Sequence, residues 1–129
     1  MKKILVIDDS EFDRRMIMSA IRSVCDDVDC VELSSGELAV DVIRAENPLL
    51  TIIDIRMPGL SGWDVLSEIR ADKALEEIKV VMMSGSHAKE DIWKASRRGA
   101  HGFYTKPHKQ SDYSLVATDM KNAYLDAAA

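Results

Sequence analysis

The amino-acid sequence predicts an α/β fold in which one parallel sheet of five strands is covered by five helices. Short apolar runs alternate with amphipathic stretches, and the expected strands begin near residues 4, 28, 49, 78 and 102, a spacing of roughly 24 residues. Strands that alternate with helices favour a parallel sheet joined by right-handed crossovers. Besides this alternation, a second observation supports the fold, because polar residues directly follow most of the apolar runs. The third is size, because 129 residues with 47% hydrophobic content suffice for one domain, residues 1–129.

Four of the five expected strands lead directly into polar residues. These are Asp8 and Asp9 after residues 4–7, Asp54 after residues 49–53, Ser84 after residues 80–83, and Lys106 with Pro107 after residues 103–105. The carboxyl ends of parallel strands meet at one edge of a sheet, where ligands bind. We therefore expect these side chains to share one pocket.

The expected helices lie between the strands and carry local start and stop signals. The first helix has an apolar stripe at spacings of three and four, formed by Phe12, Met16, Ile17, Ala20, Ile21 and Val24. Ser34 with Glu37, and Ser61 with Asp64, have the spacing of N-terminal capping boxes. Gly99 suits a left-handed C-terminal cap. Met57, Pro58 and Gly59 favour a type II turn after the third strand.

The last helix is expected from about Ser111 to Leu125, with a narrow apolar face made of Tyr113, Val116, Met120 and Tyr124. Tyr104 is expected to pack against a neighbouring helix. With all five strands in place, we expect the doubly wound, flavodoxin-like strand order 2-1-3-4-5.

Charge and hydropathy limit the function classes. The net charge is −5, with 22 acidic against 17 basic residues, which argues against direct nucleic-acid binding. The N-terminal residues lead straight into a strand, and no apolar run approaches the ~18 residues that a membrane span needs, so we expect a cytoplasmic protein with no membrane insertion.

Cysteine and histidine spacing favours no metal site. Cys25 and Cys30 lie five positions apart without a companion histidine, so reduced structural thiols are expected. His87, His101 and His108 lack acidic or thiol partners at metal spacing, and surface or capping roles are favoured.

Taken together, the polar residues after the strands closely resemble the receiver domain of two-component response regulators. The resemblance covers roughly residues 2 to 125. That family has two acidic residues after its first strand, a phosphoacceptor Asp after its third, Ser or Thr after its fourth and Lys-Pro after its fifth. Asp8-Asp9, Asp54, Ser84 and Lys106-Pro107 match these positions.

The three carboxylates predict a cation site. Two carboxylates 4 Å apart repel by roughly 4 kcal/mol at an effective dielectric constant of 20. Oxygen-only ligands fit Mg²⁺, which keeps several waters and also binds phosphate. The resemblance implies that Asp9 binds Mg²⁺ directly, that Asp8 acts through water and that Asp54 gives a carboxylate oxygen. It also implies a backbone carbonyl ligand from Arg56.

Asp54 is the expected nucleophile, because a carboxylate can attack phosphorus when Mg²⁺ and a lysine neutralise the transferring oxygens. Lys106 is placed for that role, and the resemblance implies a cis Lys106-Pro107 bond that would aim the lysine inward. It also implies that Ser84 binds a phosphoryl oxygen and that Phe103 is the switch aromatic that turns inward. The Arg56 side chain is expected at the mouth of the pocket.

The sequence therefore predicts a phosphoacceptor that assists its own phosphorylation and dephosphorylation rather than an enzyme. The resemblance implies a histidine kinase or histidine phosphotransfer protein as phosphoryl donor, and a downstream protein target. One alternative is the N-terminal receiver module of a longer regulator with an output domain. Another is a Mg²⁺-dependent phosphohydrolase with an aspartyl nucleophile, although the chain lacks the Asp-x-Asp motif and cap insertion typical of those enzymes. A flavin-binding electron carrier is disfavoured, because Asp8 and Asp9 would repel the flavin phosphate.

Overall fold

The computed structural model describes residues 1–86 and 89–126. The strands are β1 (Lys2–Ile7), β2 (Val28–Leu33), β3 (Leu50–Asp54), β4 (Lys79–Ser84) and β5 (Gly102–Thr105). The helices are α1 (Glu11–Val24), α2 (Ala39–Glu46), α3 (Gly62–Ala71), α4 (Lys89–Arg97) and α5 (Gln110–Met120). A 3-10 turn (Lys73–Leu75) follows α3, and a π turn (Lys121–Leu125) follows α5.

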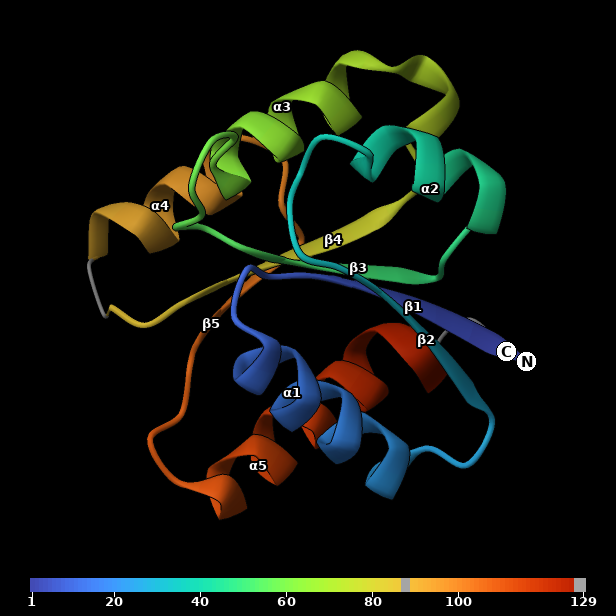
Figure 1. The fold of residues 1–129 in the computed structure, drawn as a ribbon, viewed down its shortest axis with the longest axis vertical. Helices are drawn as coiled ribbons and strands as arrows, with labels where there is room; N and C mark the ends of the chain where they lie inside the picture. Colours follow the sequence, from blue (N-terminus) through green and yellow to red (C-terminus); the bar gives the residue numbers. More distant parts are fainter. Residues whose placement is uncertain (87–88, 127–129) are drawn as a thin grey trace.

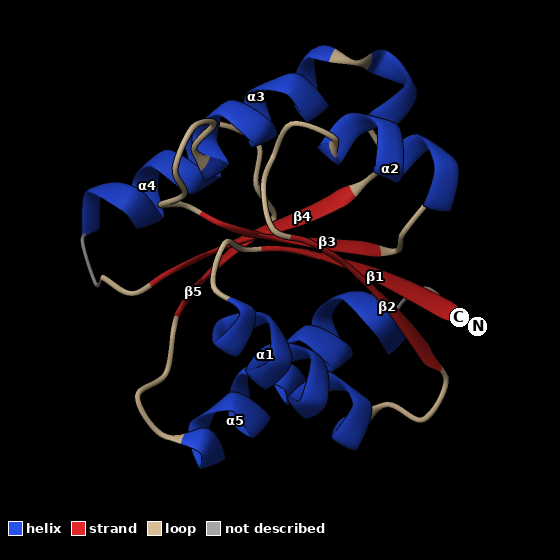
Figure 2. Ribbon diagram, viewed as in Figure 1, coloured by secondary structure: helices blue, strands red, loops and turns tan. Residues whose placement is uncertain are grey.

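All strand pairs are parallel, and the sheet has the order β2-β1-β3-β4-β5, so the predicted fold is confirmed. Figure 1 shows α1 and α5 on one face of the sheet and α2, α3 and α4 on the other. In Figure 2 the strands form a single twisted layer between these two groups of helices. Each face is therefore covered, which explains why the central strands are apolar throughout.

Alternation along the strands divides the core in two. On β1, Ile4 and Val6 pack with the α1 and α5 side chains, while Leu5 and Ile7 pack with those of α2, α3 and α4. Successive residues of a strand point to opposite faces, so every second residue enters the same core. None of the helices within the described residues is long and apolar enough to cross a membrane.

Three local signals predicted on the α3 and α4 side of the sheet agree with the structure. Ser61 caps α3 in a full capping box, since its side chain accepts the Asp64 N–H and the Asp64 carboxylate accepts the Ser61 N–H. Gly99 follows α4 with a φ of +95°, a backbone angle that side chains disfavour. The Ala100 N–H donates to the Ala95 carbonyl (2.9 Å), as in a Schellman motif. Gly59 likewise has the positive φ (74°) of a type II turn.

The capping box predicted at Ser34 and Glu37 is wrong. Helix α2 begins only at Ala39, and its N-cap Leu38 makes no side-chain cap hydrogen bond. The Glu37 carboxylate is instead hydrogen-bonded to Ser35, which lowers the pKa of Glu37.

The apolar faces of α1 and α5 differ in detail from those predicted. Phe12 is 69% exposed, whereas Met18 is buried. At the other end, Leu125 is fully buried and Tyr124 is only half-buried. A π turn adds one residue to the helical repeat, so Leu125 also enters this core, while Tyr124 packs against it as predicted.

Candidate functional site

The predicted polar residues meet at the carboxyl edge of the sheet. Asp8 follows β1, Asp54 ends β3, Ser84 ends β4 and Lys106 follows β5. Three backbone hydrogen bonds hold this edge: the Ile55 N–H donates to the Met83 carbonyl (2.9 Å), the Lys106 N–H to the Ser84 carbonyl (2.7 Å) and the Asp8 N–H to the Leu33 carbonyl (3.1 Å). The side chains therefore project from a rigid edge.

The loop after Asp54 is closed tightly against the strand. The Gly62 N–H donates to the Ile55 carbonyl (2.8 Å). A Cβ atom at Gly62 would lie 2.3 Å from the Asp54 carbonyl oxygen, so only glycine fits there. This contact holds the start of α3 against the backbone of Asp54, the expected phosphoacceptor.

Three carboxylates gather at the strand ends. Oxygen atoms of Asp8, Asp9 and Asp54 lie within 4.8 Å of one another; Asp8 and Asp54 are buried and Asp9 is exposed. Asp8 is oriented by the Ser10 N–H, which donates to its Oδ1 (2.9 Å). Since all the donors are oxygens, the cluster could hold a hard divalent cation, as the sequence predicts.

Lys106 lies among carboxylates, with its side chain 15% exposed. Its Nζ is 2.8 Å from Asp8, 2.8 Å from Asp13 and 3.1 Å from Asp54. The Lys106-Pro107 bond is not cis, because the described residues contain no cis peptide bond, so that expectation is wrong. The backbone instead directs the Lys106 side chain towards the cluster, because the Lys106 N–H donates to the Ser84 carbonyl at the end of β4.

Asp13 was not predicted as a site residue. It lies in the first turn of α1, where its N–H is accepted by the N-cap Ser10 (3.2 Å). An acid in this turn is common because it complements the helix dipole, so the sequence gives no distinct signal. Only the path of the loop after β5 brings Lys106 within 2.8 Å of the Asp13 carboxylate.

Burial and crowding set the ionisation of the cluster. Burial, followed by the charge of Asp8, raises the pKa of Asp54 to about 6 although Lys106 opposes the shift. Burial also raises the pKa of Asp8. For Lys106, burial alone would lower the pKa, but hydrogen bonds to Asp13 and Asp8 outweigh it and the pKa is raised. The pocket therefore holds more negative charge than Lys106 neutralises.

Ser84 and Phe103 do not lie in this charged cluster at rest. The Ser84 side chain is fully buried, and its hydroxyl oxygen accepts the Ser86 N–H (3.2 Å). Phe103 is half-buried and packs with the core beneath α4. Tyr104 points to the opposite face, where its hydroxyl donates to Asp119 of α5 (2.5 Å), as its predicted packing against a helix requires.

The Arg56 side chain reaches towards α4. Its Nη2 lies 3.3 Å from the Asp91 carboxylate, and the two side chains are 67% and 13% exposed. The exposed arginine therefore has a specific partner on α4. Since Arg56 is two residues from Asp54, this pair joins the loop after β3 to the first turn of α4.

The cysteines and the described histidines form no metal site with this cluster. Cys25 and Cys30 are free thiols, as expected. The His101 Nδ1 accepts the Val80 N–H (3.2 Å), which is a structural role, and His108 is exposed. His87 lies outside the described residues.

The known proteins that resemble this chain in sequence belong to one family. A model described as response regulator receiver domain matches residues 4–117. Two-component response regulator ORR5 of Oryza sativa subsp. japonica is 34% identical over 116 residues, covering 89% of this chain and 85% of that protein. Chemotaxis protein CheY of Pseudomonas aeruginosa is 30% identical over 105 residues, covering 81% and 84%. For rice ORR7, at 31% identity, the chain spans only 55% of the relative.

Solved structures agree. The phosphorylated cyanobacterial phytochrome response regulator RcpA has a TM-score of 0.88 at 27% identity, covering 99% of this chain and 96% of that one. The Mn²⁺-bound form of response regulator Rcp1 has a TM-score of 0.83 at 25% identity, covering 95% and 94%. The family match spans the sheet and the acidic cluster alike, and on this evidence the chain belongs to the response regulator receiver domain family.

Proposed function

We propose that this protein is a Mg²⁺-dependent phosphoacceptor of a two-component system, and that Asp54 receives the phosphoryl group. The observation that carries the proposal is the position of Asp54, which is 3.1 Å from the Lys106 ammonium and within 4.8 Å of Asp8 and Asp9. A carboxylate nucleophile needs cations around the transferring phosphoryl oxygens, and this cluster provides one and can hold another.

The donor set fits Mg²⁺. Asp9 and Asp54 would bind the ion directly, Asp8 through water, and the Arg56 carbonyl would complete the protein ligands. Burial and then the charge of Asp8 raise the pKa of Asp54, and a divalent cation would offset the negative charge gathered here. When bound, the ion would neutralise phosphoryl oxygens and offset the repulsion between the carboxylates.

The chemistry of this chain's residues follows from their positions. An Asp54 carboxylate oxygen attacks phosphorus and forms an acyl phosphate. The bond from phosphorus to the donor's imidazole nitrogen breaks, and that nitrogen keeps the electron pair and takes a proton from solvent. Lys106 pairs with the negative oxygens of the transferred group. Water later attacks phosphorus and restores the carboxylate.

The signalling step is a separate part of the proposal. Ser84, whose hydroxyl oxygen accepts the Ser86 N–H, would donate its hydroxyl hydrogen to a phosphoryl oxygen and draw the loop after β4 towards the site. Phe103 would turn inward as this loop moves, and so change the surface presented to a downstream protein. A histidine kinase or histidine phosphotransfer protein is the proposed donor, and residues 1–129 are proposed to act as one receiver domain, which the single sheet supports.

Chemical trapping tests this proposal. The protein is incubated with acetyl phosphate and Mg²⁺, reduced with borohydride and mapped by mass spectrometry. We expect the label on Asp54 and its loss when EDTA replaces Mg²⁺. Undiminished labelling of the Asp54→Asn variant, or labelling at another carboxylate, would sink the assignment. A matched control is Glu68→Gln, an exposed acid on α3 that should leave labelling unchanged.

A further inference from the structure

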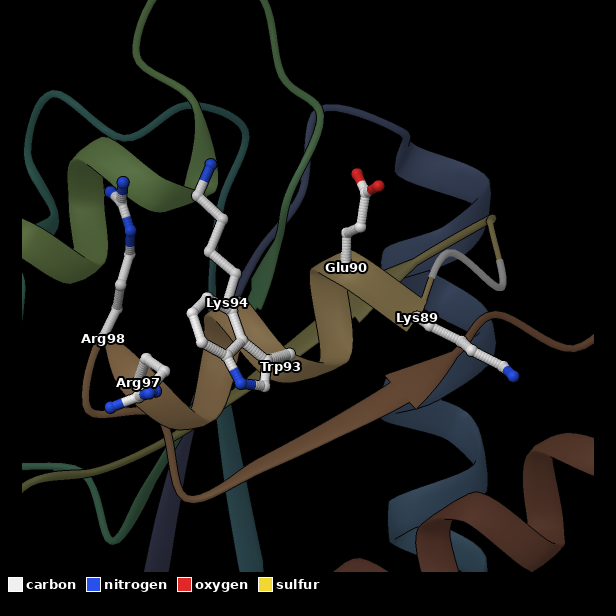
Figure 3. A pocket seen from close by; sticks show the side chains of 6 residues that line it. All are labelled: Lys89, Glu90, Trp93, Lys94, Arg97 and Arg98. Atoms are coloured by element: carbon white, nitrogen blue, oxygen red, sulfur yellow. The ribbon is translucent and has the colours of Figure 1, made fainter.

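Arg14 is a largely buried cation beside the acidic cluster. Its side chain is 12% exposed and lies near the start of α1. Arg97 and Arg98, by contrast, are exposed, and Figure 3 shows both side chains along an open groove on α4. A guanidinium that is removed from water needs hydrogen-bond partners, so the contacts of Arg14 show which parts of the chain it holds.

The Arg14 guanidinium joins α1 to two other segments. Its Nη1 donates to the Asp8 carbonyl oxygen (2.7 Å), and its Nε donates to the Glu32 carboxylate of β2 (2.7 Å). Arg14 lies four residues after the N-cap Ser10, and long side chains on a helix point back towards its N-terminus, which brings the guanidinium to the loop after β1. Because the guanidinium is a planar fork, the contact with Glu32 also fixes the direction of the Nη1 donor.

The Asp8 carbonyl belongs to the peptide unit that leads into Asp9. Since β1 ends at Ile7, this carbonyl lies beyond the strand pairs of the sheet. The Asp8 N–H donates to the Leu33 carbonyl (3.1 Å) and the Asp8 carbonyl accepts from Arg14, so the backbone is held on both sides of Asp8. A peptide unit is planar, so fixing this carbonyl also limits the direction in which Asp9 continues.

Asp9 is the carboxylate of the cluster that depends most on its backbone. It is exposed, whereas Asp8 and Asp54 are buried and pair with Lys106. Within the part of the chain that the structure describes, no ion pair includes Asp9. Neighbouring side chains therefore do little to orient this carboxylate, and the orientation of the peptide before it has the larger effect.

We propose that Arg14 is a positioning residue, which holds the Asp8–Asp9 peptide so that the Asp9 carboxylate suits Mg²⁺ rather than the larger Ca²⁺. This inference rests on the proposed function, in which Asp9 binds the metal directly. Mg²⁺ demands near-octahedral oxygen ligands at about 2.0–2.1 Å, whereas Ca²⁺ accepts longer bonds and variable geometry. A carboxylate that is free to move therefore weakens the binding of Mg²⁺ more than that of Ca²⁺.

The charge of Arg14 acts in the opposite direction to its positioning. A cation near the cluster repels a divalent ion, so loss of the charge alone would tighten the binding of Mg²⁺ and Ca²⁺ by a similar factor. Loss of the positioning weakens Mg²⁺ binding and lowers the ratio of the two affinities. The sign of the change and the ratio therefore separate the two effects.

The test is urea unfolding of the whole chain at constant ionic strength, with increasing amounts of either MgCl₂ or CaCl₂. The rise in the free energy of unfolding with cation concentration gives the dissociation constant of each ion, also for a variant of lower stability. We expect Arg14→Gln to weaken Mg²⁺ binding about tenfold and Ca²⁺ binding less than about threefold, since residues that orient metal ligands typically contribute about 10- to 100-fold to metal affinity.

The matched control is Arg15→Gln, which removes the same charge one residue further along α1. The Arg15 side chain is 74% exposed and pairs with Glu11 (2.6 Å). Because exposed charges are screened, both cation affinities of this variant should stay within about twofold of the parent.

Arg14→Lys keeps the charge without the planar fork, so its Mg²⁺ affinity should fall between those of the parent and Arg14→Gln. It takes the place of Arg14→Gln if that variant does not fold. Mg²⁺ binding that is unchanged or tighter, or an equal fall for the two ions, would overturn the proposal. A parent that gains no stability from Mg²⁺ would overturn the proposed function as well, which distinguishes the two failures.

Discussion

At the scale of single residues, the site is defined by an imbalance of charge. Three carboxylates lie within 3.1 Å of the Lys106 ammonium, and Asp9 adds a fourth negative group nearby. One lysine cannot neutralise this set, and burial strengthens the repulsion. The carboxylates are therefore held together by the fold at a cost in stability, which a bound cation would offset.

Neutralising Asp54 should stabilise the metal-free protein. In EDTA at pH 8 we expect Asp54→Asn to raise the free energy of unfolding by roughly 1–3 kcal/mol, measured by urea titration. The pKa of Asp54 is about 6 when folded, above the ordinary 3.8, so the folded state takes up the proton first as pH falls. The gain should thus be full above pH 6 and shrink towards pH 4.

Mg²⁺ provides the control for this prediction. Because the ion should stabilise the parent more than the variant, saturating Mg²⁺ should close or reverse the gap at pH 8. Glu68→Gln should behave like the parent throughout. An Asn variant no more stable than the parent in EDTA would mean that Asp54 is not under electrostatic stress.

Asp13 should restrain Lys106 in the resting state. The 2.8 Å contact ties the lysine to α1, and a charge-assisted hydrogen bond contributes roughly 1.5–3 kcal/mol. Asp13→Asn removes this competitor and a negative charge near the incoming phosphoryl group. We therefore expect beryllofluoride, a phosphoryl mimic, to bind at least about threefold more tightly in the presence of Mg²⁺, as measured by calorimetry.

The matched control is Glu11→Gln, which removes an exposed acid from the same helical turn. It should leave beryllofluoride affinity unchanged. Weaker binding to Asp13→Asn than to the parent would show that Asp13 positions Lys106 for the phosphoryl group rather than competing for it.

At the scale of elements, the loop after β3 and the helix α4 are joined by Arg56 and Asp91. Arg56 is the more exposed partner, so the pair itself adds little to stability, about 0–1 kcal/mol. The pair matters more for the position of the Arg56 guanidinium, which it holds against α4 instead of over the pocket. The same pair could therefore set how easily water reaches an acyl phosphate on Asp54.

Releasing this arginine should change phosphoryl lifetime. In Asp91→Asn we expect the decay of the phosphorylated protein to slow severalfold, since the freed guanidinium can lie over the phosphoryl group. Arg56→Ala should decay at a different rate from the parent with Mg²⁺ affinity nearly unchanged. In the double variant the Asp91 effect should vanish, which a double-mutant cycle on decay rates would measure. Additive effects would show that the pair has no role in decay.

The loop between β4 and α4 should couple the pocket to the surface through Ser84. Trp93 on α4 is exposed and stacked by Arg97, so its fluorescence reports on that helix. Beryllofluoride should change the fluorescence of the parent and of Trp63→Phe. It should do so much less in Ser84→Ala at saturation, because the hydrogen bond that favours the switched state is missing. A full parental change in Ser84→Ala, with Trp93 as its source, would exclude this coupling.

At the scale of the whole molecule, the sequence predicted what local signals encode. The strand order and the positions of the residues at the strand ends were correct, because short continuous apolar runs mark the buried parallel strands and the polar residue after each run lies at the sheet edge. The capping box at Ser61 was also predicted correctly, because it depends only on two residues three positions apart. The capping box predicted at Ser34 and Glu37 was wrong, since the Glu37 carboxylate is hydrogen-bonded to Ser35 and α2 begins only at Ala39.

Contacts between residues far apart in the sequence could not be predicted from local sequence signals. The contact of Asp13 with Lys106 joins residues 93 positions apart and depends on how the final loop lies against α1. The full burial of Leu125 beside the partly buried Tyr124 depends on a π turn that no residue type indicates. The cation–aromatic contacts of α4 with Trp63 likewise exist only once α3 and α4 pack side by side.

The most direct measurement of the central claim is a crystal structure of the protein with Mg²⁺ and beryllofluoride. The account predicts beryllium bound to an Asp54 carboxylate oxygen, Mg²⁺ on Asp9, Asp54 and the Arg56 carbonyl, and Lys106 shifted from Asp13 to a fluorine. Beryllofluoride on another side chain, or Mg²⁺ away from the Asp8, Asp9 and Asp54 cluster, would contradict it.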